Sequence, residues 1–557
     1  MTGSAVPSPA GCPENGGRPR MEVDRRRKLL SGWGGAPVSS SDVVTVTPGR
    51  PGSDGRPGSD GWQGWSQQLR RPPEEGVIAR GLGRSYGDAA QVAGGTTLDA
   101  TGLHRILEMD AVNGFARVEA GVSLEQLMAA SLPLGRFVPV TPGTRHVTVG
   151  GAIAADIHGK NHHVDGSFGT HVLALKLGAP GATLELGPDR DPEKFWATVG
   201  GMGLTGVVLE ATLDLPAVET SYMEVDTERA ADLDDVMARM EASDHEYRYS
   251  VAWIDCLAKG ASMGRSVLTR GDHARLGQLS AKQLRSPLRF DPRVKLQAPG
   301  YVPSGLLNRF TVAAFNEAWF RKAPRHETGR VMPLGSFFHP LDGVGGWNRL
   351  YGSRGFLQYQ FVVPFGREEA LREAIGRLSS SGQASFLAVL KRFGAPSSAP
   401  LSFPSPGWTL ALDLPIGDAG MTRLLDGLDE LVTEAGGRIY LAKDSRMRPE
   451  LLEAQYPGIH AWRRTRDALD PDGVMCSDLC RRLDVSGRHG GVSRCRSALS
   501  GDYRHDTTDT PPDRPTGMTS MADPAAERDG GGAPSYGGTG EGHAQTREGD
   551  RLERRSR

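Results

Sequence analysis

The chain has 557 residues, and its 65 Lys and Arg are balanced by 66 Asp and Glu. This length predicts more than one lobe, and the charge balance argues against a dedicated nucleic-acid binder. Five scattered cysteines do not form a disulfide framework, and no apolar run reaches the roughly 20 residues that span a bilayer. Because no apolar core follows the basic residues near the N-terminus, we expect no secretory signal peptide and no transmembrane helix.

Three segments have the composition of disordered chain. Residues 1–29 are rich in Gly, Pro and Arg, and residues 487–557 contain almost no large apolar side chains. Neither segment can bury enough surface to offset the entropy of ordering it. The sequence GRPGSD occurs at Gly49–Asp54 and again at Gly55–Asp60, which predicts a low-complexity insertion over 49–61.

Between these segments, strand and helix patterns are mixed without the strict spacing of βαβ units, which predicts an α+β fold. One helix is marked by Ser123 and Gln126, which have the spacing of a capping box. We expect strands at Gly76–Ala79, Phe115–Ala120, Val172–Leu177, Thr183–Leu186, Gly206–Leu215, Tyr247–Ile254, Phe356–Pro364, Thr409–Leu414 and Arg438–Ala442, and helices at Ser123–Leu132, Glu193–Val199, Glu368–Ser379 and Met421–Ala435.

The first glycine-rich loop, RGLGRSYGD at Arg80–Asp88, follows a predicted strand. Its backbone N–H groups have the arrangement expected for a pyrophosphate site, although a plain glycine turn explains the same letters. The spacing differs from G-x-G-x-x-G and no helix opens from the loop, which disfavours nicotinamide binding.

The segment Thr141–His163 is more specific. Its small residues permit close approach of the backbone to a bulky ligand, and a polar cluster with His158, His162 and His163 follows. A metal site or a hydrogen-bonded structural cluster are the alternatives, but the Glu of H-E-x-x-H is missing. With Gly200–Gly206, the chain has three glycine loops, which favours one extended ligand across them, most consistent with a flavin.

Two later stretches leave their interpretation open. In AKDSR at Ala442–Arg446, Lys443 either faces a cofactor or pairs with Asp444 at the surface, and the residues alone favour the surface pair. The run Phe337–Gln360 mixes aromatic and amide side chains, as in a sugar-binding pocket or an ordinary core with a polar edge.

Together these motifs resemble the vanillyl-alcohol-oxidase-type flavoproteins over about Leu30 to Leu483. The matching words are ARGLGRSYGDAAQ, PGTRHVTVGGAIAADIHGKNHH, GSFGTHV, FWATVGG, GLTG, FFHPLD, GFLQYQF, PLSFP, PGW and AKDSR. The resemblance implies a two-lobed FAD-binding (PCMH-type) fold with an antiparallel-sheet substrate domain. The implied domains are 30–218 for the first part of the FAD lobe, 219–437 for the substrate lobe and 438–486 for the closing segment of the FAD lobe.

By the same resemblance the cofactor is FAD and no metal is expected. Many relatives attach FAD through a His in the first glycine loop, where this chain has Tyr86, so noncovalent FAD is expected. Close relatives often carry a Cys where this chain has Ala411, so thiol-directed inhibitors should fail here. The implied FAD contacts are Ala79, Arg80, Gly81, Leu82, Gly83, Arg84, Ser85, Tyr86, Gly87, Asp88, Ala89, Gly143, Thr148, Val149, Gly150, Gly151, Ala155, Asp156, Ile157, His158, Val208 and Tyr440.

The resemblance implies oxidation of the 2′-hydroxyl of decaprenylphosphoryl-β-D-ribose to a ketone, the first half of an epimerisation that supplies arabinose for cell-wall arabinan. His158 and Lys443 are the implied catalytic residues, one as proton acceptor and one as the cation beside the flavin, and their assignment stays open. The implied substrate residues are Tyr359, Gln360, Asn348 and Lys391.

The implied partners are the polyprenylphosphoryl-ribose substrate, an NADH-dependent keto-reductase and a membrane surface. The enzyme would be peripheral at the cytoplasmic or periplasmic face, with Leu288–Phe320 as a mobile flap or as an ordinary loop packed on the substrate lobe. The alternatives are a soluble aldonolactone or alditol oxidase that uses O2, and a non-catalytic scaffold with the same fold.

Overall fold

The computed structural model describes residues 25–47, 68–70, 72–299, 302, 305–383, 385, 387–417 and 419–488. The predicted insertion at 49–61, most of the N-terminal extension 1–29 and nearly all of the tail 487–557 lie outside these residues. Among the described helices, none is both long and apolar enough to cross a bilayer.

The first sheet contains the strand that leads into the first glycine loop. Its order is β1-β2-β4-β3, with β1 (Arg25–Ser31), β2 (Val38–Thr45), β3 (Val77–Arg80) and β4 (Thr96–Asp99). The prediction of disorder up to residue 29 is wrong from Arg25 onward, because β1 pairs with β2 over its whole length. Its consecutive basic residues suit an edge strand, since charged side chains discourage further pairing.

The second sheet confirms several predicted elements. Its order is β5-β6-β9-β7-β8, with β5 (Ile106–Asp110), β6 (Phe115–Glu119), β9 (Val207–Asp214), β7 (Val172–Ala179) and β8 (Ala182–Leu186). Strands β7 and β8 form the expected hairpin, since Ala179 pairs with Ala182. Helix α2 (Leu124–Ser131) begins with the predicted capping box of Ser123 and Gln126. Helices α3 (Val149–Ala154) and α5 (Pro192–Thr198) follow in the same part of the chain.

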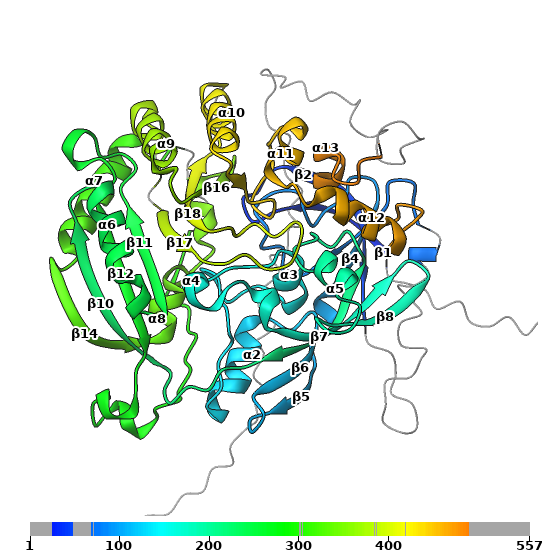
Figure 1. Ribbon diagram of the computed structural model, residues 1–557, viewed down its shortest axis with the longest axis horizontal. Helices are drawn as coiled ribbons and strands as arrows, with labels where there is room; N and C mark the ends of the chain where they lie inside the picture. Colours follow the sequence, from blue (N-terminus) through cyan, green and yellow to red (C-terminus); the bar gives the residue numbers. More distant parts are fainter. Residues whose placement is uncertain are drawn as a thin grey trace, which may run out of the picture. The chain divides into compact units, whose positions relative to one another are not determined.

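The third sheet has eight strands in the order β14-β10-β12-β11-β17-β18-β16-β19 (Figure 1). The bounds are β10 (Tyr222–Ala230), β11 (Tyr249–Ile254), β12 (Ser266–His273), β14 (His326–Pro333), β16 (Phe356–Pro364), β17 (Ala388–Phe393), β18 (Gly407–Pro415) and β19 (Arg438–Ile439). Its neighbouring strands are antiparallel, as expected for the substrate lobe.

One face of this sheet is covered by helices. Helices α6 (Leu233–Ser243), α9 (Glu368–Ser381) and α10 (Ala419–Glu434) share an apolar core with alternate residues of the strands, such as Phe361, Leu410 and Leu412. Because strand residues alternate between faces, the residues between these point to the other side. The remaining helices of this part, α7 (Arg309–Lys322) and α8 (Leu334–Phe338), lie in the segment that joins β12 to β16.

The closing segment, residues 438–486, pairs with strands of both the FAD lobe and the substrate lobe. The expected boundary at residue 438 therefore cuts through a sheet. Strand β19 pairs with β16 through Phe361 and Ile439, whereas Met475 forms a bridge to Val77 of the first sheet. The predicted strand at 438–442 is shorter because the chain turns after β19. Helices α11 (Leu452–Gln455), α12 (Ile459–Leu469) and α13 (Asp478–Leu483) complete the segment.

An arginine clamp joins the closing segment to the first glycine loop. Arg482 donates to both carboxylate oxygens of Asp88 at 2.9 Å and to Asp444 at 2.8 Å. The predicted surface pair of Lys443 and Asp444 is therefore wrong, because Asp444 is buried and takes Arg482 as its partner. Burial alone would raise the pKa of Asp444, but the nearby Arg482 guanidinium holds it below its ordinary value.

Replacing Arg482 by Met should destabilise the protein strongly, because it leaves two buried carboxylates without their cation. We expect a loss of about 3–5 kcal/mol in the free energy of unfolding, measured by urea denaturation. The matched control is Arg448→Met, which breaks the exposed pair with Glu430 and should cost less than about 1 kcal/mol. Equal losses in the two variants would contradict the clamp.

Candidate functional site

A cavity of about 710 Å³ lies between the three glycine loops and the uncovered face of the eight-stranded sheet. This volume is within the usual range for small-molecule and cofactor sites. The predicted FAD residues that line it are Ala79, Arg80, Gly81, Leu82, Gly83, Arg84, Ser85, Tyr86, Ala89, Gly143, Thr148, Gly150, Gly151, Ala155, Ile157, His158, Val208 and Tyr440. Met202, Gly203 and Gly206 add the third glycine loop to the same wall.

The glycine loops are packed so closely that larger residues would not fit. A Cβ at Gly81 would overlap the side chain of Thr148, and one at Gly150 would lie 2.9 Å from Cβ of Ala120. Gly83 has a φ of +64°, which an L side chain rarely adopts. This wall of backbone and small side chains fits a long, flat ligand with a pyrophosphate, as FAD has.

Four of the predicted FAD residues do not line the cavity. Gly87 packs against the carbonyl of Asp444, and Asp88 is held by Arg482. Val149 is buried in the apolar core beneath α3. The carboxylate of Asp156 accepts hydrogen bonds from three serine hydroxyls and one backbone N–H, given by Ser167, Ser397, Ser402 and Gly169. These four residues shape the wall from behind it.

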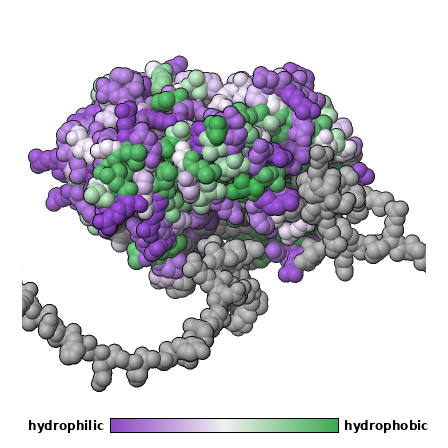
Figure 2. Space-filling model, turned by 90° about the horizontal axis from the view of Figure 1, so that it is seen from below, coloured by the Kyte–Doolittle hydropathy of each residue, from purple (hydrophilic) through white to green (hydrophobic). Residues whose placement is uncertain are grey.

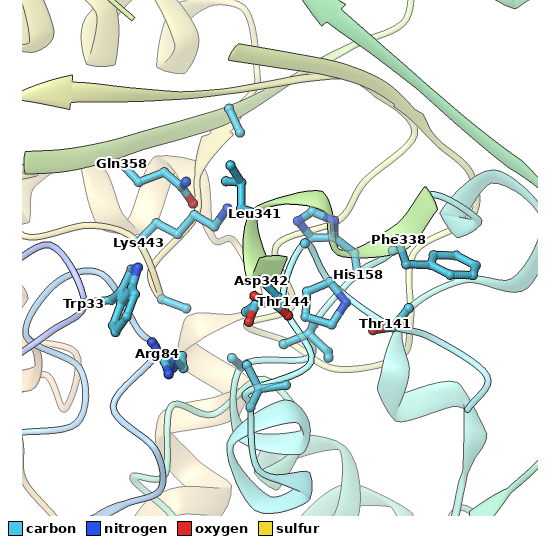
Figure 3. Close-up of a pocket in the computed structure, with 18 of the residues that line it drawn as sticks. Trp33, Arg84, Thr141, Thr144, His158, Phe338, Leu341, Asp342, Gln358 and Lys443 are labelled. Carbon is cyan, nitrogen blue, oxygen red and sulfur yellow. The ribbon is translucent and has the colours of Figure 1, made fainter. Parts of the chain in front are cut away.

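The two predicted catalytic residues face one cavity. Figure 3 shows Lys443 and Gln358 reaching into it from one side and His158 lying across from them. The Nε2 atom of His158 lies 3.1 Å from the amide nitrogen of Gln360, and its Nδ1 lies 3.4 Å from Nζ of Lys391. Both ring nitrogens therefore have neighbours within the protein, and the imidazole is fixed in place.

Burial dominates the electrostatics of this site. It lowers the pKa of Lys443 to about 7, with nearby Lys391 acting in the same direction and Asp413 opposing it. Burial likewise lowers the pKa of His158 well below its ordinary value, aided by Lys391 and Lys443. Near neutral pH, His158 is therefore uncharged and Lys443 is close to its midpoint, so it can exchange a proton.

Of the predicted substrate residues, Lys391 on β17 lines the cavity. On β16, the pleat decides which side chains reach the cavity, and Gln360 lies just behind the cavity wall, hydrogen-bonded to His158 and Thr409. Tyr359 points to the opposite face, where its hydroxyl donates to Asp429 of α10, so its assignment to the substrate is wrong. Asn348 does not line the cavity either, although its neighbour Trp347 does.

Sequence reasoning missed several residues of this wall. Gln358 lines the cavity and donates to Asp413, its register partner on β18, which is fully buried. Burial raises the pKa of Asp413 to about 7, against the opposing effect of Lys443. Lys160 and Trp253 also line the cavity. The signal for Gln358 was available, because residues 358 and 360 share one face of a strand.

The three histidines after the second glycine loop do not converge. His162 accepts a hydrogen bond from the backbone N–H of Gly394 through Nδ1, and Nε2 of His163 lies near the carbonyls of Asp244 and Tyr247. Among the described residues, no group of three or more His, Cys, Asp or Glu is placed to hold a metal ion. The contacts of His162 and His163 hold the turn around His158 in shape.

The comparisons agree with this geometry. A model of the FAD binding domain family matches residues 72–185, which include the first two glycine loops. Together with the cavity, this match defines the class of the protein as an FAD-binding flavoprotein.

Similar proteins show to which family of flavoproteins the chain belongs. The decaprenylphosphoryl-beta-D-ribose oxidase of Mycolicibacterium smegmatis is 47% identical over 473 residues, which cover 83% of this chain and 99% of that protein. An uncharacterized protein from the mprA 5′ region of Streptomyces coelicolor is 44% identical over 65% of this chain and its own full length. L-galactono-1,4-lactone dehydrogenase of Arabidopsis thaliana is 26% identical over 38% of this chain and 34% of its own length. The chain belongs to the decaprenylphosphoryl-beta-D-ribose oxidase family of flavoproteins.

The lowered pKa of Lys391 should make the free energy of unfolding depend on pH. Burial lowers the pKa of Lys391 to about 8, so between pH 8 and its unfolded pKa near 10.4 the unfolded chain binds more protons and stability rises with pH. Replacing Lys391 by Met removes this dependence. The variant should exceed the wild type in unfolding free energy at pH 7, and the gap should shrink toward pH 10.

This pH dependence is checked by urea denaturation at several pH values. The matched control is Lys194→Met, which removes a lysine that pairs with Asp191 outside the cavity. A gap between Lys391→Met and the wild type that stays constant from pH 7 to pH 10 would show that the lysine is not held against its charged form.

Proposed function

We propose that this chain oxidises the 2′-hydroxyl of decaprenylphosphoryl-β-D-ribose to the 2′-keto product. One observation carries the proposal: a single cavity runs along the eight-stranded sheet from Lys443 and Gln358 to several large apolar side chains. Lys443 and Gln358 line its end at β16 and β19, whereas Trp253, Val267 and Met332 line its end at β11, β12 and β14. The polar side chains that share this second end are Thr227, Thr269, Glu327 and Arg330. A sugar fits the first end and a hydrocarbon chain the second, and the Mycolicibacterium relative is named for such a substrate.

The proposed chemistry divides between the cofactor and Lys443. Bound FAD supplies a two-electron hydride acceptor. As the ribose carbon loses its hydride, the attached hydroxyl loses a proton, and Lys443, which lines the β16 end of the cavity and whose pKa is lowered to about 7, is proposed to take it. His158, fixed by Gln360 and Lys391, presents an uncharged ring at the same place. We propose His158 as the second catalytic residue because it faces the reacting end of the cavity.

We also propose that FAD is bound without a covalent link. Of the described residues that line the cavity, His158 is the one histidine and none is a cysteine. Both nitrogens of His158 already have neighbours in the protein. Burial raises the pKa of the Tyr86 phenol well above its ordinary value, which keeps it neutral and unreactive.

An epimerisation requires a second enzyme. The proposed product is a ketone, and the inverted alcohol forms only when a hydride returns to the opposite face of that carbon. We therefore propose an NADH-dependent keto-reductase as the functional partner that consumes the product.

Lipid-linked ribose should bleach the flavin of the purified protein without oxygen. A short-chain prenylphosphoryl-ribose is expected to remove the absorbance of oxidised flavin, and a free alditol is not. Acid precipitation of the same protein should leave the yellow flavin in the supernatant. Bleaching by the alditol but not by the lipid-linked ribose, with rapid reoxidation by O2, would instead favour a soluble alditol or aldonolactone oxidase.

Two variants distinguish a role of Lys443 as proton acceptor from a purely electrostatic role of its charge. Lys443→Met should slow bleaching by about 10²–10⁴, the usual contribution of a positioned acid or base. Lys443→Arg keeps the positive charge but cannot become neutral at pH 7, so it should be as slow. Flavin content near that of the wild type controls for folding. Fast bleaching in Lys443→Arg would assign this position an electrostatic role only.

We propose that the segment around α7 attaches the enzyme to an anionic membrane surface. Residues 281–330 contain ten Lys or Arg and three Asp or Glu. On α7, the exposed fractions of Phe310, Phe315 and Trp319 are 70%, 44% and 45%, and Trp319 also lines the cavity. Exposed aromatic and basic side chains are typical of helices that lie at a bilayer interface. Figure 2 illustrates that exposed apolar residues gather in groups rather than spreading evenly.

We interpret the predicted flap at Leu288–Phe320 as part of the same membrane-contacting region as α7. Much of α7 belongs to it, and β13 (Leu296–Gln297) pairs with β15 (Val344–Gly345). A helix at the mouth of the cavity offers a lipid chain a short path from the membrane, which supports the interfacial proposal over a plain connecting loop.

Vesicle binding tests the proposed membrane contact. Phe310→Ser with Phe315→Ser should weaken the affinity for anionic vesicles, measured by sedimentation, by about 30-fold, because each of the two aromatic side chains contributes about 1 kcal/mol when buried. The matched control replaces Val112 and Leu173, which are exposed elsewhere, by Ser. Binding that is insensitive to the α7 variant, to high salt and to the removal of anionic lipid would contradict this contact.

A further inference from the structure

Two lysines line the middle of the cavity, between its end at β16 and its end at β14. Lys391 belongs to β17, and Lys160 follows the turn that carries His158. The carbonyl of Lys160 accepts a hydrogen bond of 2.9 Å from the backbone N–H of Ser250, at the start of β11. Strands β17 and β11 are neighbours, so both lysines lie at one place along the sheet.

Neither lysine has an acidic partner. In the part of the chain that the structure describes, no salt bridge involves Lys160 or Lys391. Nζ of Lys160 donates to the carbonyl of Phe337 and lies 4.0 Å from the centre of the Phe337 ring. Nζ of Lys391 lies 3.4 Å from Nδ1 of His158. These contacts hold the amines in place but do not neutralise them.

Two half-buried cations without counter-ions are costly unless a ligand supplies negative charge. Burial lowers the pKa of Lys160 to about 7, and the neighbouring Lys391 adds to this effect. An anion bound between the two amines would stabilise the protonated form of both. The glycine loops already offer backbone N–H groups to the pyrophosphate of FAD, which leaves this lysine pair for another anion.

We propose that Lys160 and Lys391 form the subsite for the phosphate group of the lipid-linked substrate. The inference rests on the proposed function, and strand order supports it. Along the sheet, the ribose end at β16 and β18 is followed by the lysine pair at β17 and β11. Strands β12, β10 and β14 come next, where Val267 and Met332 line the cavity beside Thr227, Thr269, Glu327 and Arg330. Sugar, phosphate and hydrocarbon occur in the same order in the substrate.

The subsite is tested with farnesyl phosphate and farnesol as ligands of the FAD-loaded enzyme. The wild type should bind farnesyl phosphate at least about tenfold more tightly than farnesol, corresponding to one charge-assisted contact. Lys160→Gln and Lys391→Gln should each remove most of this preference and raise KM for prenylphosphoryl-ribose. Lys194→Gln, outside the cavity, should behave as the wild type. The preference should also weaken above pH 8, as the amines lose their protons.

The outcomes separate this inference from the function on which it rests. If the wild type oxidises prenylphosphoryl-ribose but the two lysine variants keep the preference for farnesyl phosphate, the subsite is wrong and the function stands. If the lysines govern the preference but lipid-linked ribose does not bleach the flavin, the subsite stands and the function fails. Inorganic phosphate that binds as tightly as farnesyl phosphate would show a free-anion site and overturn the assignment to a lipid-linked phosphate.

Discussion

The pleat of the eight-stranded sheet is the constraint on which the cavity depends. Each strand sends alternate side chains to opposite faces, so the helices and the cavity share the same strands. Val251 and Trp253 on β11, and Val389 and Lys391 on β17, enter the cavity at a spacing of two residues. The residues between them pack beneath α6, α9 and α10. A helix-covered face holds the strands rigid, and a rigid floor can position reactive groups.

The second constraint is electrostatic, because three half-buried lysines line the same cavity. Lys160, Lys391 and Lys443 all line it. Asp413 behind Gln358 opposes the effect of Lys391 on the pKa of Lys443. In the free protein, the pKa values of these amines are lowered to about 7 for Lys160 and Lys443 and to about 8 for Lys391, so each amine is partly uncharged near neutral pH. An anionic substrate favours their protonated forms, while Lys443 must be able to accept a proton. Lys443 follows β19, whereas Lys391 lies on β17 and Lys160 on the turn after His158, so different side chains of one cavity can meet the two requirements.

Much of this architecture could be predicted from local patterns. The capping box at Ser123, the hairpin around Pro180 and the three glycine loops depend on neighbouring residues, and the structure contains all of them. The face of β16 was harder to predict from apolar residues, because both of its faces are buried, and only the alternation that groups Gln358 with Gln360 separates them from Tyr359.

Contacts between residues far apart in the sequence explain the remaining differences between the sequence predictions and the structure. Asp444 is taken by Arg482, which is 38 residues later in the chain, so the neighbouring Lys443 was free to enter the cavity. The basic strand β1 was predicted as disordered because its own residues do not favour a strand, whereas its pairing with β2 does. Lys160 gave no local signal, because its role depends on the approach of β11 and β17.

A crystal structure with a short-chain prenylphosphoryl-ribose bound to the oxidised Lys443→Met variant tests the central claim most directly. The order of the three regions predicts the ribose at the β16 end, the phosphate within hydrogen-bond distance of Lys160 and Lys391, and the prenyl chain along Trp253 and Val267. A phosphate bound at the Arg84 end of the cavity, with Lys160 and Lys391 making no contact to it, would contradict the account.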